Sequence, residues 1–595
     1  EPYFQGRTRH WNVTHYDELG RIAEVDSAAG DDVRYLYAED AAGTCSENDV
    51  RGVLSVNALG QKRLELTNPL GERVVSFDSH CGRVDYTHDA IGNVTEVQGA
   101  DSSVIRMSYD VAGRKVMMDD PDKGVWRYRW NALGELERQL DAKRQATDYA
   151  YDNMGRVTDR WELKNMDGLL DSNFQLAAHE ETRWINSTSA QIRGKSQPEK
   201  VIYQRGVDGS LIHGKDFHYD EFGRVSRVQS SQSGLQFSEE TTYDQFGRVF
   251  QQFDASGDYR GIKSTYNSDG YLVNIKESRE GELGVVYKEV LSRDARGNIS
   301  HLMLGNGVDV FATRADSSGR LQRLEAYDVL GRLLQDIQYE FDAAGNLERK
   351  TDRSSSTVRI EDYGYDDLNR LLKVEFTSPG DGILSPTETL ALSYDASGNI
   401  AWKSDVGSYQ YGAGGAGPHA VTSAGGASYS HDANGNQVSG AGRSISYSTF
   451  DKAIEIESAT QNTKFEYGIG NRRMSRQDRS SVDGEKTTHY IGSVEWIEQN
   501  GVGVFKRTIG NVAISEFNPS SQETRTRYLI RDHLGSIHVM ADEGGRIENA
   551  SWLSFDAFGQ RRSAEGYSPL GATELAGLNS FTNRGFTGHE HVDAL

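Results

Sequence analysis

Short stretches in which apolar and polar residues alternate recur along the whole chain. The stretch RVSRVQS after Gly223 is an example, and such alternation predicts β-strands with one apolar face. Turn-forming residues interrupt these stretches at intervals that leave roughly six residues for each strand. No run of about 18 or more apolar residues occurs, so the sequence predicts no membrane-spanning helix. We therefore expect an almost entirely β fold made of many short strands.

One turn sequence, Tyr-Asp-x-x-Gly, occurs far more often than the 29 Tyr and 63 Gly of this chain would give by chance. The Asp side chain can accept backbone N–H groups two residues on, and Gly can adopt the positive φ that closes a hairpin turn. An apolar residue usually follows and begins the next strand, as Val225 does. Complete copies begin at Tyr16, Tyr109, Tyr151, Tyr219, Tyr243, Tyr327 and Tyr394, and degenerate copies at His88, Trp130, Phe253, Tyr266, Arg293, Ala315, Phe341, His431 and Phe555.

The spacing of the turns is nearly constant in the first part of the chain. One series of turns recurs every 21 residues, and a second series is offset from it by about half that period. A turn therefore occurs every ten or eleven residues, as expected for consecutive hairpins. The first series begins at Thr67, His88, Tyr109, Trp130 and Tyr151, and the second includes Val56 and Phe77.

A long ribbon of such hairpins should coil into a wall around a hollow. Sheets twist with a fixed hand, so a long ribbon does not remain flat. Hydrophobic residues make up only 36% of the chain, which suits a wall better than a solid globule. We also expect the aromatic ring before each Asp to stack over its neighbour in the next coil. The predicted fold is all-β: an antiparallel β-hairpin meander coiled into a hollow shell, whose closure the sequence leaves open.

Three stretches depart from the repeat. Residues 161–208 lose the period and are expected to be irregular, with a short helix over FQLAAHEE (174–181). Residues 412–428 are rich in Gly, Ala and Ser, which favours a flexible loop, with closely packed small-residue strands as the alternative. SPLGATELAGL (568–578) has room for one helical turn. The predicted divisions are 1–6 (tag remnant), 7–160 (repeat wall), 161–208 (insertion), 209–411 (repeat wall), 412–428 (Gly-rich loop) and 429–595 (C-terminal core).

The net charge limits the classes of binding partner, and the cysteine content limits the number of disulfide bonds. The net charge of −23 argues against DNA or RNA, because phosphate contacts need a basic face. A concave acidic interior would attract a basic cargo, although the sequence does not place the charges. The two cysteines, Cys45 and Cys81, could form one disulfide bond, but two cysteines are too few for a disulfide framework.

The repeats and the C-terminal third resemble a known family, the RHS/YD-repeat superfamily. It includes bacterial Rhs polymorphic toxins, the C component of insecticidal toxin complexes, wall-associated repeat proteins and animal teneurins. By this resemblance, 429–595 is the N-terminal part of the RHS-repeat-associated core. The matching segments are GPHAVTSAGG (417–426), YLIRDHLGSIHVMAD (528–542), SFDAFGQRRS (554–563) and GFTGHEHVDAL (585–595).

The resemblance implies a function in containment. In the bacterial members a hollow β-cocoon holds the protein's own C-terminal toxin, which is released by self-cleavage. The acidic residues of the self-cleaving segment lie beyond GFTGHEH, so no catalytic residue is carried over and we expect no enzyme activity. The implied partners are a C-terminal toxin or effector beyond Leu595 and a secretion apparatus or carrier protein. The implied location is secreted or on the bacterial cell surface.

Other motifs were weighed as binding sites. His589 and His591 would share one face of a strand and could bind zinc, but a packing role is favoured. IRGKS (192–196) ends like a phosphate-binding loop but lacks the leading Gly. DANGNQ (432–437) lacks the Gly that a calcium loop needs at its sixth place, so its Asp is read as a turn former. We therefore predict no catalytic, cofactor-binding or metal-binding residue and no cofactor.

Two other functions remain open from the sequence. The repeats could form a rigid scaffold for cell-surface adhesion or carbohydrate binding, with 161–208 as the recognition loop. The chain could instead be a polysaccharide-degrading enzyme with paired carboxylates, although 88 acidic residues guarantee some such pairs without function.

Overall fold

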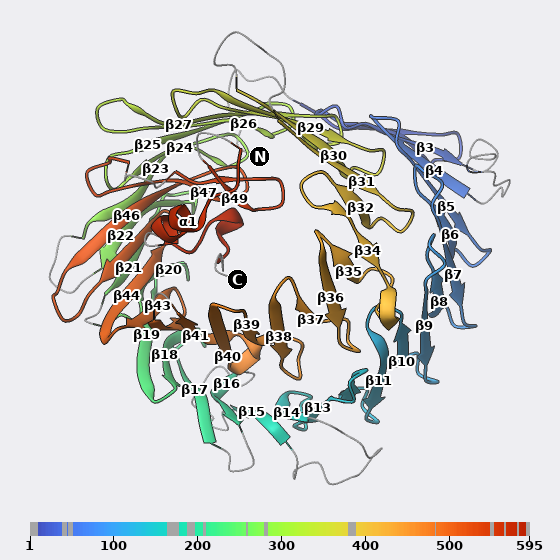
Figure 1. Ribbon diagram of the computed structural model, residues 1–595, viewed down its shortest axis with the longest axis horizontal. Coiled ribbons are helices and arrows are strands. Elements are labelled where there is room, and N and C mark those ends of the chain that lie inside the picture. Colours follow the sequence, from blue (N-terminus) through green and yellow to red (C-terminus); the bar gives the residue numbers. More distant parts are fainter. Residues whose placement is uncertain are drawn as a thin grey trace.

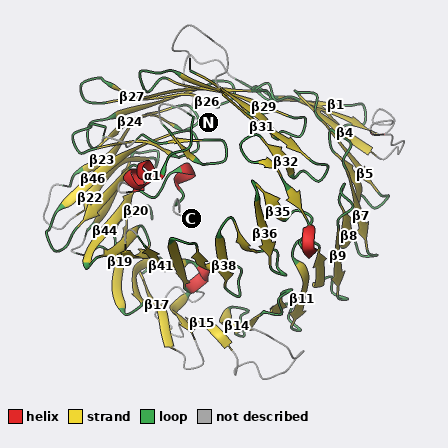
Figure 2. Ribbon diagram, viewed as in Figure 1, coloured by secondary structure: helices red, strands yellow, loops and turns green. Residues whose placement is uncertain are grey.

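Strands dominate the part of the chain that the structure describes. The computed structural model describes residues 10–37, 45, 52–163, 178–186, 197–205, 210–257, 260–278, 284–378, 388–481, 484–547, 552–563, 567–579 and 582–590. Within these ranges there are one α-helix and three 3-10 helices of three residues each, as Figure 2 shows in red.

Two long meanders contain nearly all of the strands. The first sheet has 33 strands, from β1 (Val13–Tyr16) to β33 (Gly407–Ser408), and the second has 14, from β34 (Gln410–Tyr411) to β47 (Ile537–Ala541). Within each sheet, each strand pairs antiparallel with the next strand in the chain, as β7 (Arg83–His88) does with β8 (Val94–Gln98) and β41 (Arg473–Ser480) does with β42 (Gly484–Ile491). The predicted antiparallel all-β meander is confirmed.

Turns of the repeat alternate between the two edges of this ribbon. The turns of the Tyr109 series lie on one edge, which we call the first edge. The turns offset by half a period, such as those after β4 (Gly52–Asn57) and β6 (Arg73–Phe77), lie on the opposite, second edge. The two predicted series therefore correspond to the two edges of one wall.

The ribbon winds around a centre in two circuits (Figure 1). Residues on the second edge of the first circuit bind residues on the first edge of the second circuit. Gln61 contacts Asn369, 308 residues later, and Lys143 contacts Asp432, 289 residues later. One circuit therefore takes about 300 residues in this part of the chain.

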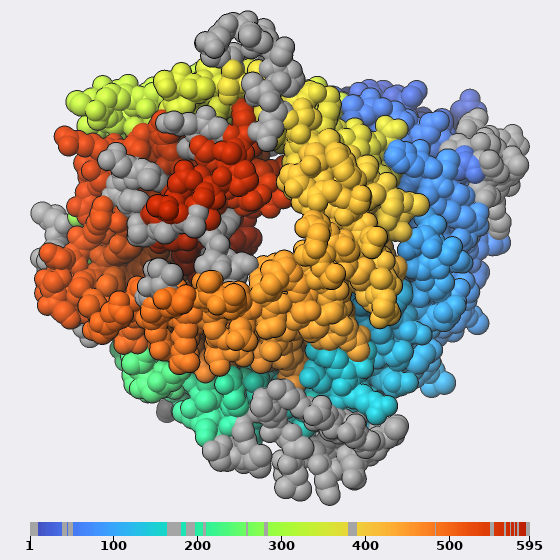
Figure 3. Space-filling model, viewed as in Figure 1, coloured from blue at the N-terminus to red at the C-terminus, as the bar shows by residue number. Residues whose placement is uncertain are grey.

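The second circuit is shorter than the first and lies partly inside it. Contacts pair Lys143 with Asp432 and Asn306 with Asp542. Between these contacts the first circuit uses 163 residues and the second only 110, as a smaller circumference requires. In Figure 1 the strands from β35 (Val421–Ala424) to β39 (Ala453–Glu457) lie within the ring of first-sheet strands. The space-filling view shows an opening through the centre of the molecule (Figure 3).

Apolar packing joins the two circuits. One buried cluster combines Leu304 and Val308 of the first circuit with Ile530 and Val539 of the second. All four side chains are 2% exposed or less. At roughly 25 cal/mol per Å² of buried apolar area, such a cluster strongly favours contact between the circuits.

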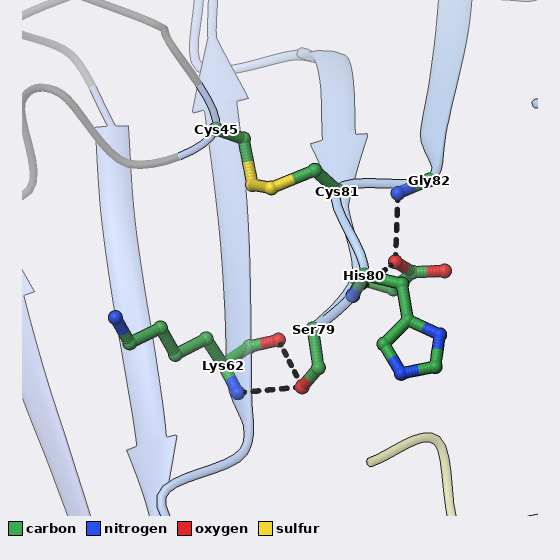
Figure 4. The surroundings of a disulfide bond; sticks show 7 residues. Cys45, Lys62, Ser79, His80, Cys81 and Gly82 are labelled. Atoms are coloured by element: carbon green, nitrogen blue, oxygen red, sulfur yellow. Dashed lines mark hydrogen bonds between the residues drawn. A yellow bond between two sulfur atoms is a disulfide. The ribbon is translucent and has the colours of Figure 1, made fainter. Parts of the chain in front are cut away.

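A disulfide joins Cys45 to Cys81, 36 residues later (Figure 4). Cys45 packs on a cluster of apolar residues from β4–β6 that includes Leu54 and Phe77. Cys81 occupies the turn position that Gly usually holds, with φ of 61°. The sequence did not decide whether this bond forms. In the structure the bond fixes Cys45 to a turn on the second edge. Such a link typically contributes roughly 2–4 kcal/mol.

The described part of 161–208 is strand and not an irregular insertion. It includes the end of β14 (Val157–Leu163) together with β15 (Ala178–Asn186) and β16 (Pro198–Arg205). Residues 178–181 of the predicted helix lie in β15, so that prediction is wrong there. β15 and β16 have nine and eight residues, and these longer strands removed the 21-residue period without interrupting the wall.

The second half of the Gly-rich stretch 412–428 differs from the favoured prediction. It contains β35 (Val421–Ala424) and the start of β36 (Ala427–His431), which pair through a tight turn at Gly425 and Gly426. Both glycines have positive φ, which few other residues adopt. The small-residue strands, which were the alternative, are therefore present. The predicted tag remnant, 1–6, lies outside the described residues, and the remaining divisions stay predictions.

Candidate functional site

Several complete turns of the repeat are linked to the next turn on the same edge. Asp244 Oδ1 accepts the backbone N–H groups of Phe246 and Arg248, and its Oδ2 accepts Nε of Arg248 at 2.7 Å. The Arg248 guanidinium lies 4.4 Å from the ring centroid of Tyr266. The Tyr266 hydroxyl donates to the carbonyl of Val249 at 2.8 Å. A turn thus holds the tyrosine that begins its successor.

The rings in these contacts stack under arginines of the preceding turn. The same contact joins Arg224 to Tyr243 and Arg370 to Tyr394, at 4.2 and 4.4 Å. Ring-on-ring stacking between coils was expected at these positions, and it is not what these tyrosines do. A cation–π contact contributes about 0.5–1 kcal/mol at an exposed site, so many of them stiffen the edge.

Buried ion pairs close the seam between the two circuits. Arg507 of the second circuit is 1% exposed, and its guanidinium lies 2.7 Å from Asp254 and 3.1 Å from Glu277 of the first. Burial by itself would lower the pKa of Arg507, but the two carboxylates outweigh burial and raise it. The guanidinium therefore stays charged and fixes the register of the circuits.

The described residues between 552 and 590, here called the C-terminal segment, are also held by a buried ion pair. Arg562 lies 2.6 Å from Glu361 of the first sheet, and both side chains are at most 5% exposed. Burial raises the pKa of Glu361, but Arg562 and Lys350 lower it to about 2. Glu361 is therefore ionised throughout the physiological range.

This segment lies on the inner side of the wall. It contains β48 (Ser554–Phe555), β49 (Arg561–Arg562), α1 (Ala572–Asn579) and a 3-10 turn at Phe586–Gly588. Leu553, Phe555 and Leu578 pack with Leu529 and Met540 of the second sheet. This face of the second sheet is opposite to the one that carries Ile530 and meets the first circuit. Figure 1 places α1, in red, within the ring.

A cavity of about 330 Å³ lies where the C-terminal segment meets the first sheet. Its lining includes Asp352, His533 and His538. His538 has Nδ1 3.1 Å from the side chain of Gln335 and Nε2 3.2 Å from Asp352. Both ring nitrogens therefore have partners that stabilise the seam.

The HEH sequence acts through its glutamate. The carboxylate of Glu590 binds Arg473 and Arg476, while His589 is exposed and contacts Thr587. His591 lies outside the described residues. Sequence reasoning singled out the histidines and missed Glu590, because its partners lie more than 100 residues earlier.

The structure describes one of the two other motifs that the sequence suggested as binding sites. Asp432 accepts the N–H groups of Asn434 and Asn436, so it forms a turn as predicted. IRGKS (192–196) lies outside the described residues. Over the described ranges, no cluster of three or more His, Cys, Asp or Glu side chains is placed to hold a metal ion. None of the helices in that part of the chain has the length and apolar character that a membrane crossing requires.

Comparison with known proteins gives both sequence and structural likenesses. No family model matches the chain. Double-stranded DNA deaminase toxin A of Burkholderia cenocepacia (strain H111) is 23% identical over 398 residues, which cover 60% of this chain and 25% of that protein. The chain therefore spans about a quarter of the length of this curated relative.

Solved structures share the fold over nearly the whole chain. A crystal structure of TcdB2-TccC3-Cdc42 has a TM-score of 0.75 at 15% identity, covering 97% of this chain and 31% of that chain. A crystal structure of TcdB2-TccC3 has a TM-score of 0.72 at 14% identity, covering 97% and 32%. The chain therefore has the fold of the TcdB2-TccC3 structures, and these likenesses support the resemblance to the RHS/YD-repeat superfamily that its turn repeat indicates.

Proposed function

We propose that this chain is the wall of a shell that encloses a C-terminal toxin or effector and helps to deliver it. The observation that carries the proposal is the two-circuit wall around a central opening, with the C-terminal segment on its inner side (Figures 1 and 3). A polypeptide that continued from this segment would begin next to the hollow. In this proposal the chain itself performs no catalysis.

The buried long-range ion pairs suit containment. Arg507 and Arg562 join parts of the chain that are more than 200 residues apart, and both are nearly inaccessible to solvent. Removing one member of such a buried pair typically costs about 3–5 kcal/mol, so a wall closed in this way resists opening.

The partners and the location of the protein are part of the same proposal. Its partners are its own C-terminal toxin or effector and a secretion apparatus or carrier protein. The name of the Burkholderia relative describes a toxin, which supports this class of cargo. The Cys45–Cys81 disulfide fits secretion or a place on the bacterial cell surface, because disulfides persist in oxidising surroundings. The division of the chain at 429 into wall and RHS-associated core belongs to this proposal.

Small-angle X-ray scattering and electron cryo-microscopy test the proposal directly. The purified chain should have a low-density interior, and the same chain extended by an effector polypeptide should gain density inside the wall. The extension should also resist a protease that digests it rapidly when free. A solid particle, or an effector that lies outside the wall and is digested at the free rate, would contradict the proposal.

A further inference from the structure

The last described residues double back against the second sheet. A backbone bridge pairs Arg584 with Glu590, and Gly585 N–H donates to the carbonyl of His589 at 3.0 Å. The turn between them includes Thr587, whose φ of 51° is uncommon for a β-branched residue. A backbone conformation of this kind persists when surrounding contacts hold it. The segment 582–590 therefore needs an anchor.

The carboxylate of Glu590 provides that anchor. Its oxygens lie 2.7 Å from Arg473 and 2.9 Å from Arg476, both in β41 (Arg473–Ser480). The hydroxyl of Tyr490, in the neighbouring strand β42 (Gly484–Ile491), lies 3.0 Å away, and Asn583 donates at 2.6 Å. The Glu590 side chain is only 11% exposed. Hydrogen bonds between ionised partners are roughly twice as strong as neutral ones.

Arg473, Arg476 and Tyr490 form the site that receives Glu590, here called the receptor, and their charges and hydrogen-bond donors suit a carboxylate. Arg476 is 9% exposed and is shared between Asp478 and Glu590. Burial by itself would lower the pKa of Arg476, but these two carboxylates raise it. Without Glu590, Arg476 would keep Asp478 as a partner, and Arg473 would lose the carboxylate that it binds. The two arginines therefore supply positive charge for one carboxylate in addition to Asp478.

A second ion pair fixes the other end of the turn. Arg584 lies 2.6 Å from Glu495 of β43 (Val494–Gln499). The turn is also joined to the edge of β47, where Ile537 N–H donates to the carbonyl of Gly585. The segment 582–590 is thus attached to the second sheet through four of its strands, β41, β42, β43 and β47.

We infer that Glu590 is a positioning residue: by occupying the Arg473–Arg476–Tyr490 receptor, it directs the polypeptide that follows residue 590 along the inner wall. The inference rests on the proposed function and adds to it the contact that holds the cargo's starting point inside. A chain without this contact would fold its wall normally but leave its C-terminal end free to move toward solvent.

The test uses the full chain extended beyond Leu595 by a short linker with one protease recognition sequence. With wild-type Glu590, cleavage should be at least about tenfold slower than in a free peptide of the same sequence, because cleavage requires local opening. Glu590→Gln, which keeps the shape and removes the charge, should be cleaved at least about tenfold faster than the wild type. Glu590→Asp should fall between them. The wall should remain folded at the temperature of the assay, because Arg476 keeps Asp478 as a partner.

The control is Glu498→Gln, because Glu498 lies on β43 and its side chain is 50% exposed. It should be cleaved like the wild type. Equal protection of the wild type and Glu590→Gln would overturn the inference and leave the proposed function standing. A wild-type site cleaved at the free rate would instead contradict the proposed function.

Hydrogen exchange then decides the role of Glu590 by itself. The amides of Gly585 and His589 should exchange at least about tenfold faster in Glu590→Gln, and unchanged exchange would overturn the inference. If that variant does not fold, Arg473→Gln provides the same comparison, because Arg473 is 37% exposed and its loss leaves Arg476 in place.

Discussion

In the turns built on an aspartate, one carboxylate oxygen accepts backbone N–H groups, and in several of them the other oxygen binds the arginine four residues later. Asp366 has this geometry with Leu368 and Arg370, and its side chain is 9% exposed. The part of this pattern that lies within five residues could be predicted from sequence. The contact from Arg370 to the ring of Tyr394 could not, because it depends on the length of the intervening hairpin.

Replacing Asp366 with alanine should destabilise the chain by about 1–2 kcal/mol, because two backbone donors and one guanidinium lose their acceptor. The neighbouring residue provides a matched control. Asp367 is 74% exposed and the ring of His80 lies 3.9 Å from its carboxylate, so Asp367→Ala should change stability by less than about 0.5 kcal/mol. Chemical denaturation measures both, and equal effects would show that the turn hydrogen bonds contribute little.

The same carboxylates predict a loss of stability in acid. Side-chain hydrogen bonds from Arg114 and Arg156 lower the pKa of Asp110 and of Asp152 below the ordinary value of 3.8. The folded state therefore binds protons less readily than the unfolded state. Its extra stability is present above about pH 4 and is lost as the pH falls through the lowered pKa values. The midpoint of thermal unfolding should fall between pH 5 and pH 3, and a constant midpoint would contradict this explanation.

At the scale of the turn and its strands, the apolar residue at the corner of the turn has a different environment in each circuit. On the first edge of the first circuit, where no second coil lies, the apolar corner residues are 67–103% exposed. On the first edge of the second circuit, Phe450 and Leu368 hold the corresponding position and are partly buried against the first circuit. The exposed corners are Leu19, Leu70, Ile91, Val111, Leu133, Met154, Phe222 and Phe246.

Truncating a covered corner should therefore cost more than truncating an exposed one. Phe450 contacts the ring of Tyr467 and the guanidinium of Arg160, so Phe450→Ala should destabilise the chain by about 1–3 kcal/mol. Leu133 is 81% exposed, and Leu133→Ala should stay within about 0.5 kcal/mol of the wild type. Denaturant midpoints compare the two variants. A large loss for Leu133→Ala would mean that the edge is covered in solution.

At the scale of the molecule, the sequence predicts the wall but not its seam. The 21-residue spacing and the Asp–Gly turns are local signals, so strands, turns and antiparallel order could be predicted from them. Pairing across the seam depends on how many strands complete a circuit, and no local signal carries that number. Arg507 and Asp254 are 253 residues apart, and Glu590 and Arg473 are 117 apart. The long strands β15 and β16 were missed for a related reason, because they break the period while continuing the sheet.

The seam makes the most demanding prediction. Arg507→Met should destabilise the chain by about 3–5 kcal/mol, because it leaves Asp254 and Glu277 buried without their cation. Arg227→Met is the control: Arg227 is 47% exposed beside Glu240, and its loss should cost less than about 1 kcal/mol. Both effects are measured by chemical denaturation.

A triple variant separates lost packing from uncompensated charge at this site. If unpaired carboxylates cause most of the loss, adding Asp254→Asn and Glu277→Gln to Arg507→Met should recover at least about half of it. If the loss comes from the missing guanidinium stem, the added substitutions should recover nothing. The second result would mean that the circuits are held by apolar packing around residues such as Val308 and Ile530, and that the ion pairs only set the register.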